Sequence, residues 1–363
     1  MNRDYNRLLS ELQKRMNPEG YSDTKLFGET VNKELLNVTG YKVLEYVKRS
    51  MQGVGKEYTD KSIAAGNNVK DHLKSVLTEV TYEFQGSVMT NTHIKGNSDI
   101  DLLLLCDKFY YSDNDGIKSK FSDSLLKSEL NSFQIERLQS HVTNAGQYKG
   151  DGDADLKAIR MSSEKKLMEV YYVTDVSKPK CIRIKNQSLH RDVDVVIASW
   201  YKTFEGIKDR DTKRNHIRIY NKELNSVGRI ESPFITIERI NNKNSTVNGR
   251  LKKMIRFVKT LKADSVYADQ IDLSSFELNA ICYNIDIFDY MTKPFYDLVP
   301  VLGNEFANIV SDPIYRDKIK SIDGSENIFK GKPEKVNSLR LLLKEIMDVL
   351  NDMNINLIPS YVN

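Results

Sequence analysis

The 363-residue chain contains only three cysteines and one tryptophan, and it has no long apolar run. Cys106, Cys181 and Cys282 are scattered and odd in number, which predicts reduced thiols in a cytosolic protein without a disulfide framework or a metal-binding cysteine motif. No stretch approaches the roughly 18 apolar residues that a membrane span requires. The polar start, Met1–Tyr5, lacks the apolar core of a signal peptide. We therefore expect a cytoplasmic protein that does not act at a membrane.

The chain also lacks a strong excess of charge of either sign. Its 54 basic and 50 acidic residues give a net charge of +4, too small for a protein that coats nucleic acid. The basic residues Arg250, Lys252, Lys253 and Arg256 form a local cluster, for which a solvated helix face is a better interpretation than a polyphosphate or RNA contact. A hydrophobic content of 40% and this length indicate a globular protein with a large core.

Two carboxylates stand one residue apart at the head of an apolar run. Asp99 and Asp101 flank Ile100, and four leucines follow at residues 102–105. Because side chains alternate along a β-strand, both carboxylates should project to one side while Ile100 and Leu102 face the core. Adjacent carboxylates repel unless a cation neutralises them. The pattern favours Mg²⁺, which prefers oxygen ligands and shares them with phosphates; a solvated strand end is the alternative.

A Gly86-Ser87 pair precedes these carboxylates. Glycine lets the backbone approach a ligand closely, and backbone N–H groups together with a serine hydroxyl can hold phosphate oxygens. Neither the glycine–serine pair nor the carboxylate pair is specific alone. In this order and at this short spacing they predict a site for a metal-bound triphosphate.

A third carboxylate is expected from residues 190–198, where Asp192 and Asp194 alternate with Val193 and Val195. Three carboxylates from two neighbouring strands can hold two metal ions, which activate an attacking hydroxyl and stabilise a departing pyrophosphate. Alternation places Asp192 and Asp194 on the same face, so it does not decide which one is the ligand. The other residue is then a surface carboxylate beside Arg191.

Gly86-Ser87, Asp99-Ile100-Asp101 and Val193-Asp194-Val195 together resemble the G-S, D-h-D and h-D-h motifs of the polymerase-β-like nucleotidyltransferases, where h is a hydrophobic residue. The wider stretch 85–101 resembles the bacterial relatives of cyclic GMP-AMP synthase and oligoadenylate synthase. The resemblance runs from about Thr81 to about Tyr283. It implies catalytic and metal-binding roles for Asp99, Asp101 and Asp194, with Mg²⁺ as the cofactor and Mn²⁺ as a second option.

A downstream pattern supports the narrower resemblance. Residues 248–263 show helical spacing of apolar side chains with Lys259 on the other side, and a second helix is expected from Ser275 through Tyr283. In the resembled synthases, these positions supply a lysine for the triphosphate and a serine–aromatic pair for the donor base. The resemblance therefore assigns nucleotide binding to Lys259, Ser275 and Phe276, together with Gly86 and Ser87. By themselves, Lys259 fits a solvated helix residue and Phe276 a core residue.

The resemblance implies an α+β fold: a polymerase-β-like core of mixed β-sheet and helices, braced by an N-terminal helix and packed against a C-terminal helical domain. The expected ranges are 1–80 for the bracing helices, 81–207 for the catalytic core and 208–363 for the helical domain. Helices are expected at 2–16, 24–51, 69–80 and 336–350, and strands at 81–85, 99–106, 166–173, 181–185 and 192–199. The segments 151–155 and 241–248 are interpreted as polar loops.

These observations predict a Mg²⁺-dependent nucleotidyltransferase that joins ATP or other NTPs into a cyclic di- or trinucleotide and releases pyrophosphate. In the resembled enzymes such a product is a second messenger of anti-phage defence, detected by a separate effector. The animal DNA sensor of this family carries a clustered Cys/His zinc insertion, which this sequence lacks; a nucleic-acid activator stays open. The alternatives are a transferase that modifies RNA, tRNA or a protein, and a catalytically inactive nucleotide-binding scaffold.

Overall fold

The computed structural model describes residues 3–16, 39–94, 100–144, 146 and 148–354. The chain forms two compact units. A sheet unit consists of residues 55–89 and 99–238, and a helical unit consists of residues 1–54, 90–98 and 239–363. Asp99 and residues 24–38 of the helix expected over 24–51 lie outside the described residues, and the remainder of that expected helix corresponds to α2 (Thr39–Met51).

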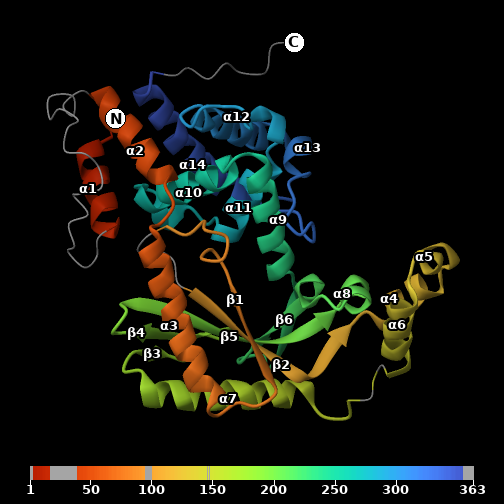
Figure 1. Ribbon diagram of the computed structural model, residues 1–363. Helices are drawn as coiled ribbons and strands as arrows, with labels where there is room; N and C mark the ends of the chain where they lie inside the picture. Colours follow the sequence, from red (N-terminus) through yellow and green to blue (C-terminus); the bar gives the residue numbers. More distant parts are fainter. Residues whose placement is uncertain (1–2, 17–38, 95–99, 145, 147, 355–363) are drawn as a thin grey trace. The chain divides into compact units, whose positions relative to one another are not determined.

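The sheet unit contains the following elements (Figure 1): helices α3 (Lys56–Lys74), α4 (Asn114–Ser122), α5 (Ser124–Ser128), α6 (Ser132–Asn144), α7 (Gly152–Val170), α8 (Phe204–Asp209) and the 3₁₀ turn η2 (Thr212–Arg214), with strands β1 (Val80–Gln85), β2 (Ile100–Ser112), β3 (Thr174–Asp175), β4 (Ile182–Asn186), β5 (Arg191–Lys202), β6 (His216–Asn221) and β7 (Ser226–Glu231).

The helical unit contains α1 (Tyr5–Met16), α2 (Thr39–Met51), α10 (Arg250–Asp264), η3 (Ala268–Gln270), α11 (Ser275–Asn284), η4 (Ile287–Asp289), α12 (Leu298–Ser311), α13 (Pro313–Arg316) and α14 (Pro333–Asp352). Helix α9 (Pro233–Thr246) begins in the sheet unit and belongs to the helical unit from Arg239 onward.

The described strands form one mixed, seven-stranded sheet with the order β1-β2-β5-β4-β3, and β6 pairs with both β5 and β7. Strand β5 lies parallel to β2 along most of its length. On its other side, its first half pairs antiparallel with β4 and its second half pairs antiparallel with β6. The central position of β2 and β5 explains their nearly continuous apolar sequences, because both faces of these strands are buried.

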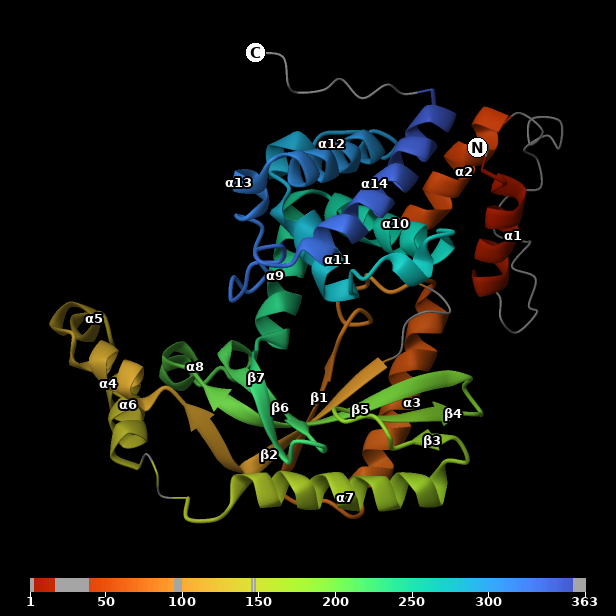
Figure 2. The same cartoon turned by 180° about the vertical axis from the view of Figure 1, so that it is seen from behind.

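One face of the sheet is covered by α3 and α7, which lie across the strands (Figure 2). Val69 and Leu73 of α3, together with Leu156 and Ile159 of α7, join the core that includes Leu102. All five side chains are at most 7% exposed. Burial of this alternate set of strand residues fixes the register, because a slip by one residue would turn the apolar side chains to the opposite face.

The opposite face has a second apolar cluster toward the ends of β2 and β5. Leu103 and Leu105 meet Val196 and Ala198, and Trp200 packs against Phe234 at the start of α9. The residues that precede this cluster on the same face are Asp101 and Asp194. The carboxylates therefore stand on a face whose packing is fixed by its apolar continuation.

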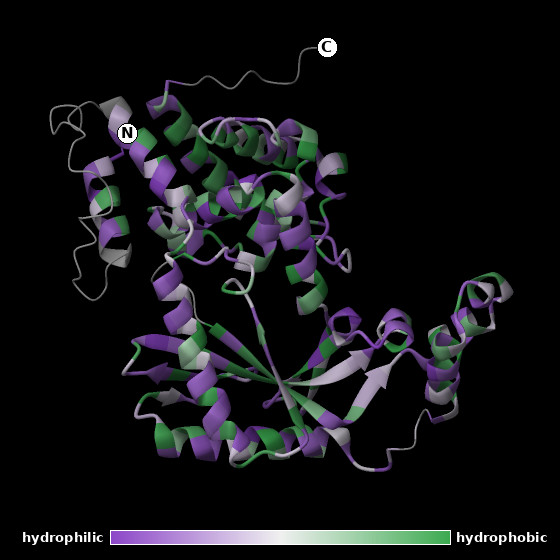
Figure 3. Cartoon of the chain, in the orientation of Figure 1, coloured by the Kyte–Doolittle hydropathy of each residue, from purple (hydrophilic) through white to green (hydrophobic). Residues whose placement is uncertain are grey.

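Helices α4, α5 and α6 form a small lobe beyond the end of β2, together with α8 (Figure 2). Ile117, Leu138 and Phe204 are buried at the centre of this lobe. In the helical unit, α10 contacts α2, α11, α12 and α14. Its apolar side chains are buried in the unit's core, and Figure 3 shows frequent apolar residues on α12 and α14. No helix among the described residues is both long and apolar enough to cross a membrane.

Several sequence-based predictions are confirmed. The expected strands at 81–85, 99–106, 181–185 and 192–199 correspond to β1, β2, β4 and β5, although Asp99 itself is outside the described residues. The expected first and last helices correspond to α1 and α14. The helices expected after residues 248 and 274 are α10 and α11.

Four predictions of local structure are wrong. The helix expected over 69–80 ends at Lys74 as part of α3, and Val80 already begins β1. Residues 166–170 form the end of α7 rather than a strand, because Leu167 completes the helical stripe with Ile159 and Leu156. The segment 151–155 is the start of that helix, where the Asp151 carboxylate accepts hydrogen bonds from two backbone N–H groups. Residues 241–246 are helical within α9 rather than a loop.

The expected division at residues 80 and 207 differs from the division seen in the structure. Helix α3 covers the sheet and belongs to the same unit, although it precedes residue 80. The hairpin of β6 and β7 follows residue 207 but extends the sheet through its pairing with β5. The basic cluster at the start of α10 also differs from expectation, because Arg256 is only 6% exposed.

Candidate active site

The two described carboxylates of the predicted metal site are neighbours across parallel strands. Asp101 on β2 and Asp194 on β5 are register partners. Partners in a ladder project their side chains to the same face, so these two carboxylates lie side by side. Both residues are half-buried, whereas Leu102 and Val195, which follow them, are buried on the opposite face. The structure thus brings together two of the three residues predicted from separate parts of the sequence.

Gly86 lies directly against the Asp101 carboxylate. It follows the last residue of β1, Gln85, which is the antiparallel partner of Asp101. Gly86 has a φ of +84°, a left-handed conformation that favours glycine. A Cβ added here would overlap Oδ2 of Asp101 and lie 3.2 Å from its Cγ. The glycine is therefore required both for the turn and for the space beside the carboxylate.

Ser87 follows this glycine in the turn and is half-buried. Its position next to Gly86 places the serine one residue beyond the backbone that lies against Asp101. The structure thus brings the Gly86-Ser87 pair to the carboxylates, as the sequence pattern predicts.

Asp194 also binds an arginine that the sequence analysis did not identify. Arg183 on β4 is the antiparallel partner of Asp194. Its Nε and Nη2 atoms donate to the two carboxylate oxygens over 2.8 and 2.6 Å. Asp192, the competing candidate, is half-buried on the same face and has Lys185 as its register partner. The sequence did contain a signal for this ion pair, since the basic residues Arg183 and Lys185 alternate in their strand just as Asp192 and Asp194 do.

The residues at this face fit a divalent cation. Carboxylate oxygens are the ligands that Mg²⁺ prefers. The Asp101 carboxylate lies against Gly86, where an added Cβ would overlap its Oδ2. The bidentate ion pair with Arg183 shows that the electrostatic field at Asp194 attracts a cation. Within the described part of the chain no group of three or more acidic, histidine or cysteine side chains is arranged to hold a metal; Asp99 lies outside that part.

Lys259 lies in the helical unit, in the middle of α10. It is 5% exposed, and its Nζ donates to the backbone carbonyl of Thr92 over 3.2 Å. Burial lowers the pKa of the Lys259 ammonium to about 8, opposed by the nearby Cys282 thiol. No carboxylate among the described residues pairs with it. With one carbonyl partner among the described residues, this buried ammonium retains unused donors, which suits the binding of an anion.

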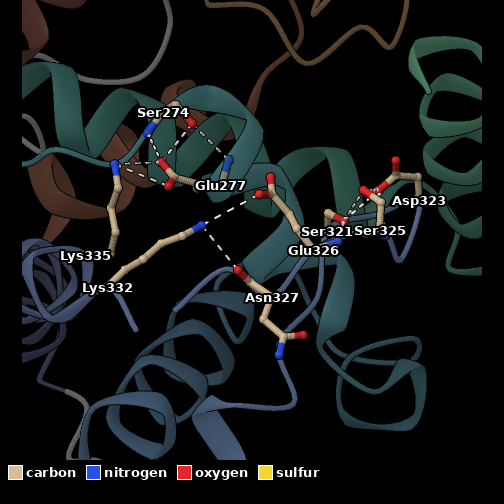
Figure 4. Close-up of polar contacts among 9 residues, drawn as sticks. All are labelled: Ser274, Glu277, Ser321, Asp323, Ser325, Glu326, Asn327, Lys332 and Lys335. Carbon is tan, nitrogen blue, oxygen red and sulfur yellow. Dashed lines mark hydrogen bonds and ion pairs between the residues drawn. The ribbon is translucent and has the colours of Figure 1, made fainter. Parts of the chain in front are cut away.

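The start of α11 is held rigidly by polar contacts (Figure 4). Ser274 caps the helix, and the Glu277 carboxylate accepts hydrogen bonds from both the N–H and the hydroxyl of Ser274, over 2.7 and 2.8 Å. Lys335 approaches the same carboxylate within 3.3 Å. This arrangement positions the next two residues: Ser275 is exposed, and Phe276 is half-buried against the core of the helical unit.

Comparisons with known proteins place these features in a family. Residues 238–351 match the cGAS/DncV-like nucleotidyltransferase C-terminal helical domain. The chain is 41% identical to a c-di-GMP synthase from Lachnospiraceae bacterium (strain RUG226), over 97% of this chain and 99% of that relative. It is 42% identical to a c-di-GMP synthase from Capnocytophaga granulosa, over 97% and 98% of the two chains.

The chain belongs to the cGAS/DncV-like nucleotidyltransferases. A solved structure supports this assignment: a STING-associated CdnE c-di-GMP synthase from Flavobacteriaceae sp. matches with a TM-score of 0.82 and 38% identity, over 97% of this chain and 99% of that chain. The expected family, α+β fold and enzyme class are thereby confirmed. This member is a nucleotidyltransferase that makes cyclic dinucleotides from nucleoside triphosphates, in a class that uses a divalent metal.

Proposed function

We propose that this enzyme condenses two molecules of GTP into cyclic di-GMP and releases two molecules of pyrophosphate. The supporting observation is the register pair of Asp101 and Asp194 with Gly86 against the first carboxylate. The choice of GTP rests on the relatives, because proteins about 40% identical over nearly their full lengths are c-di-GMP synthases.

Asp101 and Asp194 are proposed to hold Mg²⁺ together with Asp99. The bound metal supplies charge neutralisation of the triphosphate and of the developing pyrophosphate. The Arg183 guanidinium donates to both oxygens of Asp194 and so holds this carboxylate in position on β5. Asp192 is proposed to stay outside the reaction.

The nucleotide-binding roles follow the sequence prediction. Gly86 and Ser87 offer backbone and hydroxyl donors to the triphosphate. Lys259 is proposed to bind phosphate with the ammonium donors that its one carbonyl partner leaves unused. Ser275 and Phe276 are proposed to contact the base, because a ring face can stack on any base.

The chemistry consists of two equivalent transfers. In the first transfer, a ribose hydroxyl oxygen of one GTP forms a bond to the α-phosphorus of the other. The bond from that phosphorus to the β-phosphate oxygen breaks, and the hydroxyl proton is released. In the second transfer, the free hydroxyl of the linear dinucleotide attacks the remaining α-phosphorus and closes the ring. Positioning and charge neutralisation supply the rate acceleration.

The cyclic product is proposed to act on a separate effector protein, in anti-phage signalling in the cytoplasm. A STING-associated synthase from Flavobacteriaceae sp. is among the similar solved structures. Its association is a property of that protein and indicates which kind of effector to test first.

Base choice can be tested with the purified protein, Mg²⁺ and each NTP supplied alone or in pairs. Mass spectrometry should find cyclic di-GMP in the GTP-only reaction and in every mixture that contains GTP. A main product that contains adenine or a pyrimidine would contradict the choice of GTP. Label that appears on added RNA or protein would contradict cyclic dinucleotide synthesis itself.

A further inference from the structure

Arg256 lies one helical turn before Lys259 on α10 and is almost completely buried, with 6% of its surface exposed. Its Nε donates to the carbonyl of Met51 over 2.9 Å, and its Nη1 donates to the carbonyl of Asn91 over 2.7 Å. All three residues belong to the helical unit. The guanidinium thus joins the C-terminal end of α2 to a segment that is 40 residues later in the chain.

The two carbonyls lie on either side of residues 55–89, a segment in which the chain leaves the helical unit and then returns to it; we call this segment the excursion. Residues up to 54 belong to the helical unit, residues 55–89 belong to the sheet unit, and residue 90 returns to the helical unit. Met51 lies just before the departure, and Asn91 lies just after the return. The excursion contains α3, β1 and the Gly86-Ser87 turn. Arg256 is therefore bonded to the chain on both sides of the segment that carries the proposed triphosphate-binding serine.

The segment after the return has no regular structure of its own. Asn91 has a left-handed φ of 52°, and Thr90 and Thr92 are buried with their hydroxyls 2.8 Å apart. Neither a helix nor a β-ladder holds the carbonyls of Asn91 and Thr92. They accept hydrogen bonds from Arg256 and Lys259 instead. Hydrogen bonds from charged donors are stronger than those from neutral donors, so these contacts can fix irregular backbone.

The burial of Arg256 is costly. It lowers the pKa of the guanidinium to about 10, and no carboxylate among the described residues neutralises the charge. Apolar residues would fill this helix face at a lower free-energy cost, because a buried charge loses its hydration and needs compensating interactions. In the described part of the chain its hydrogen-bond partners are the carbonyls of Met51 and Asn91, which points to a role in fixing those carbonyls.

We infer that Arg256 is a positioning residue for the transfer reaction, because it fixes both ends of the chain segment that carries Gly86 and Ser87. This inference rests on the proposed function, since it assigns the residue a consequence for turnover. In this role the residue acts through the backbone of Met51 and Asn91, whose carbonyls accept its hydrogen bonds.

The test compares Arg256→Met and Arg256→Lys with the control Arg250→Met. Arg250 is on the same helix and also donates to a backbone carbonyl, that of Lys293 over 2.7 Å, but it does not contact either end of the excursion. Amide hydrogen exchange, GTP turnover and thermal melting are measured for each variant. Arg256→Met should speed exchange at residues 90–94 and lower kcat by roughly 10²-fold with a smaller change in KM, because misplacement by about 1 Å costs that much.

Arg256→Lys keeps the charge but reaches fewer acceptors, so it should fall between the wild type and Arg256→Met in both exchange and kcat. If Arg256→Met does not fold, the exchange and kcat of Arg256→Lys test the positioning role instead. Folded variants with wild-type exchange at residues 90–94 and wild-type kcat would overturn the inference, as would equal effects of Arg250→Met. If the wild type makes no cyclic di-GMP, the proposed function fails while the exchange measurements still test the positioning role.

Discussion

Gly86→Ala tests the geometry of the site with a single methyl group. The new Cβ would overlap Oδ2 of Asp101 and lie 3.2 Å from its Cγ, so the carboxylate has to move. A displacement of about 1 Å at a reacting centre costs about 10²-fold in rate, which corresponds to about 2.7 kcal/mol in the activation barrier. The left-handed φ of +84° adds a backbone penalty of about 1–2 kcal/mol to the folded state.

The matched control for this variant is Gly324→Ala. Gly324 has a φ of +80°, but nothing lies within 4 Å of an added Cβ. It lies in the turn formed by Ser321, Asp323 and Ser325, drawn in Figure 4. Both variants should therefore lose similar stability from the backbone, measured by thermal and denaturant unfolding. Only Gly86→Ala should lose turnover of GTP. Near-wild-type turnover by Gly86→Ala, or an equal loss by Gly324→Ala, would refute the reasoning.

Four further predictions follow from the same contacts. Asp194→Asn should abolish turnover while Asp192→Asn retains it, as measured by pyrophosphate release; the reverse result would transfer the ligand role to Asp192. Arg183→Gln should lower the melting temperature in EDTA and tighten Mn²⁺ binding, because a competing cation is removed from Asp194; unchanged Mn²⁺ affinity would argue against a metal at that carboxylate. Burial lowers the pKa of Lys259 to about 8, and only the protonated ammonium attracts phosphate, so kcat/KM for GTP should fall as pH rises through 8. Lys259→Arg should stay active to higher pH. Identical pH profiles of the two proteins would remove Lys259 from triphosphate binding. Phe276→Ala should weaken GTP binding by about 1–3 kcal/mol and Phe276→Tyr by much less; a lower melting temperature with unchanged affinity would make the ring a core residue.

The sheet and its carboxylates were predictable because strand alternation is a local signal. Acidic and apolar residues at every second position oriented Asp101 and Asp194 correctly before any pairing was known. The pairing of β2 with β5 is a contact between residues 93 positions apart, which no local pattern contains. The family resemblance, rather than any local pattern, indicated that the carboxylates of these two strands belong to one site.

The misread segments have a common physical cause. Polar composition favoured loops at 151–155 and 241–248, but polar side chains also cap helices and cover their solvated faces. For the same reason, the sequence predicted that Arg256 lies on a solvated helix face. Helical spacing places a basic residue beside an apolar stripe, but it does not show that backbone carbonyls from distant segments will enclose the guanidinium.

The most direct test of the central claim is a GTP-only reaction with Mg²⁺ in which pyrophosphate release and product mass are measured together, for the wild type and for Asp101→Asn. The wild type should yield cyclic di-GMP with two pyrophosphates released per cyclic molecule, and folded Asp101→Asn should yield neither. Cyclic product from the folded variant would contradict the assignment of the carboxylate pair. Absence of any cyclic dinucleotide from the folded wild type under these conditions would contradict the proposed reaction.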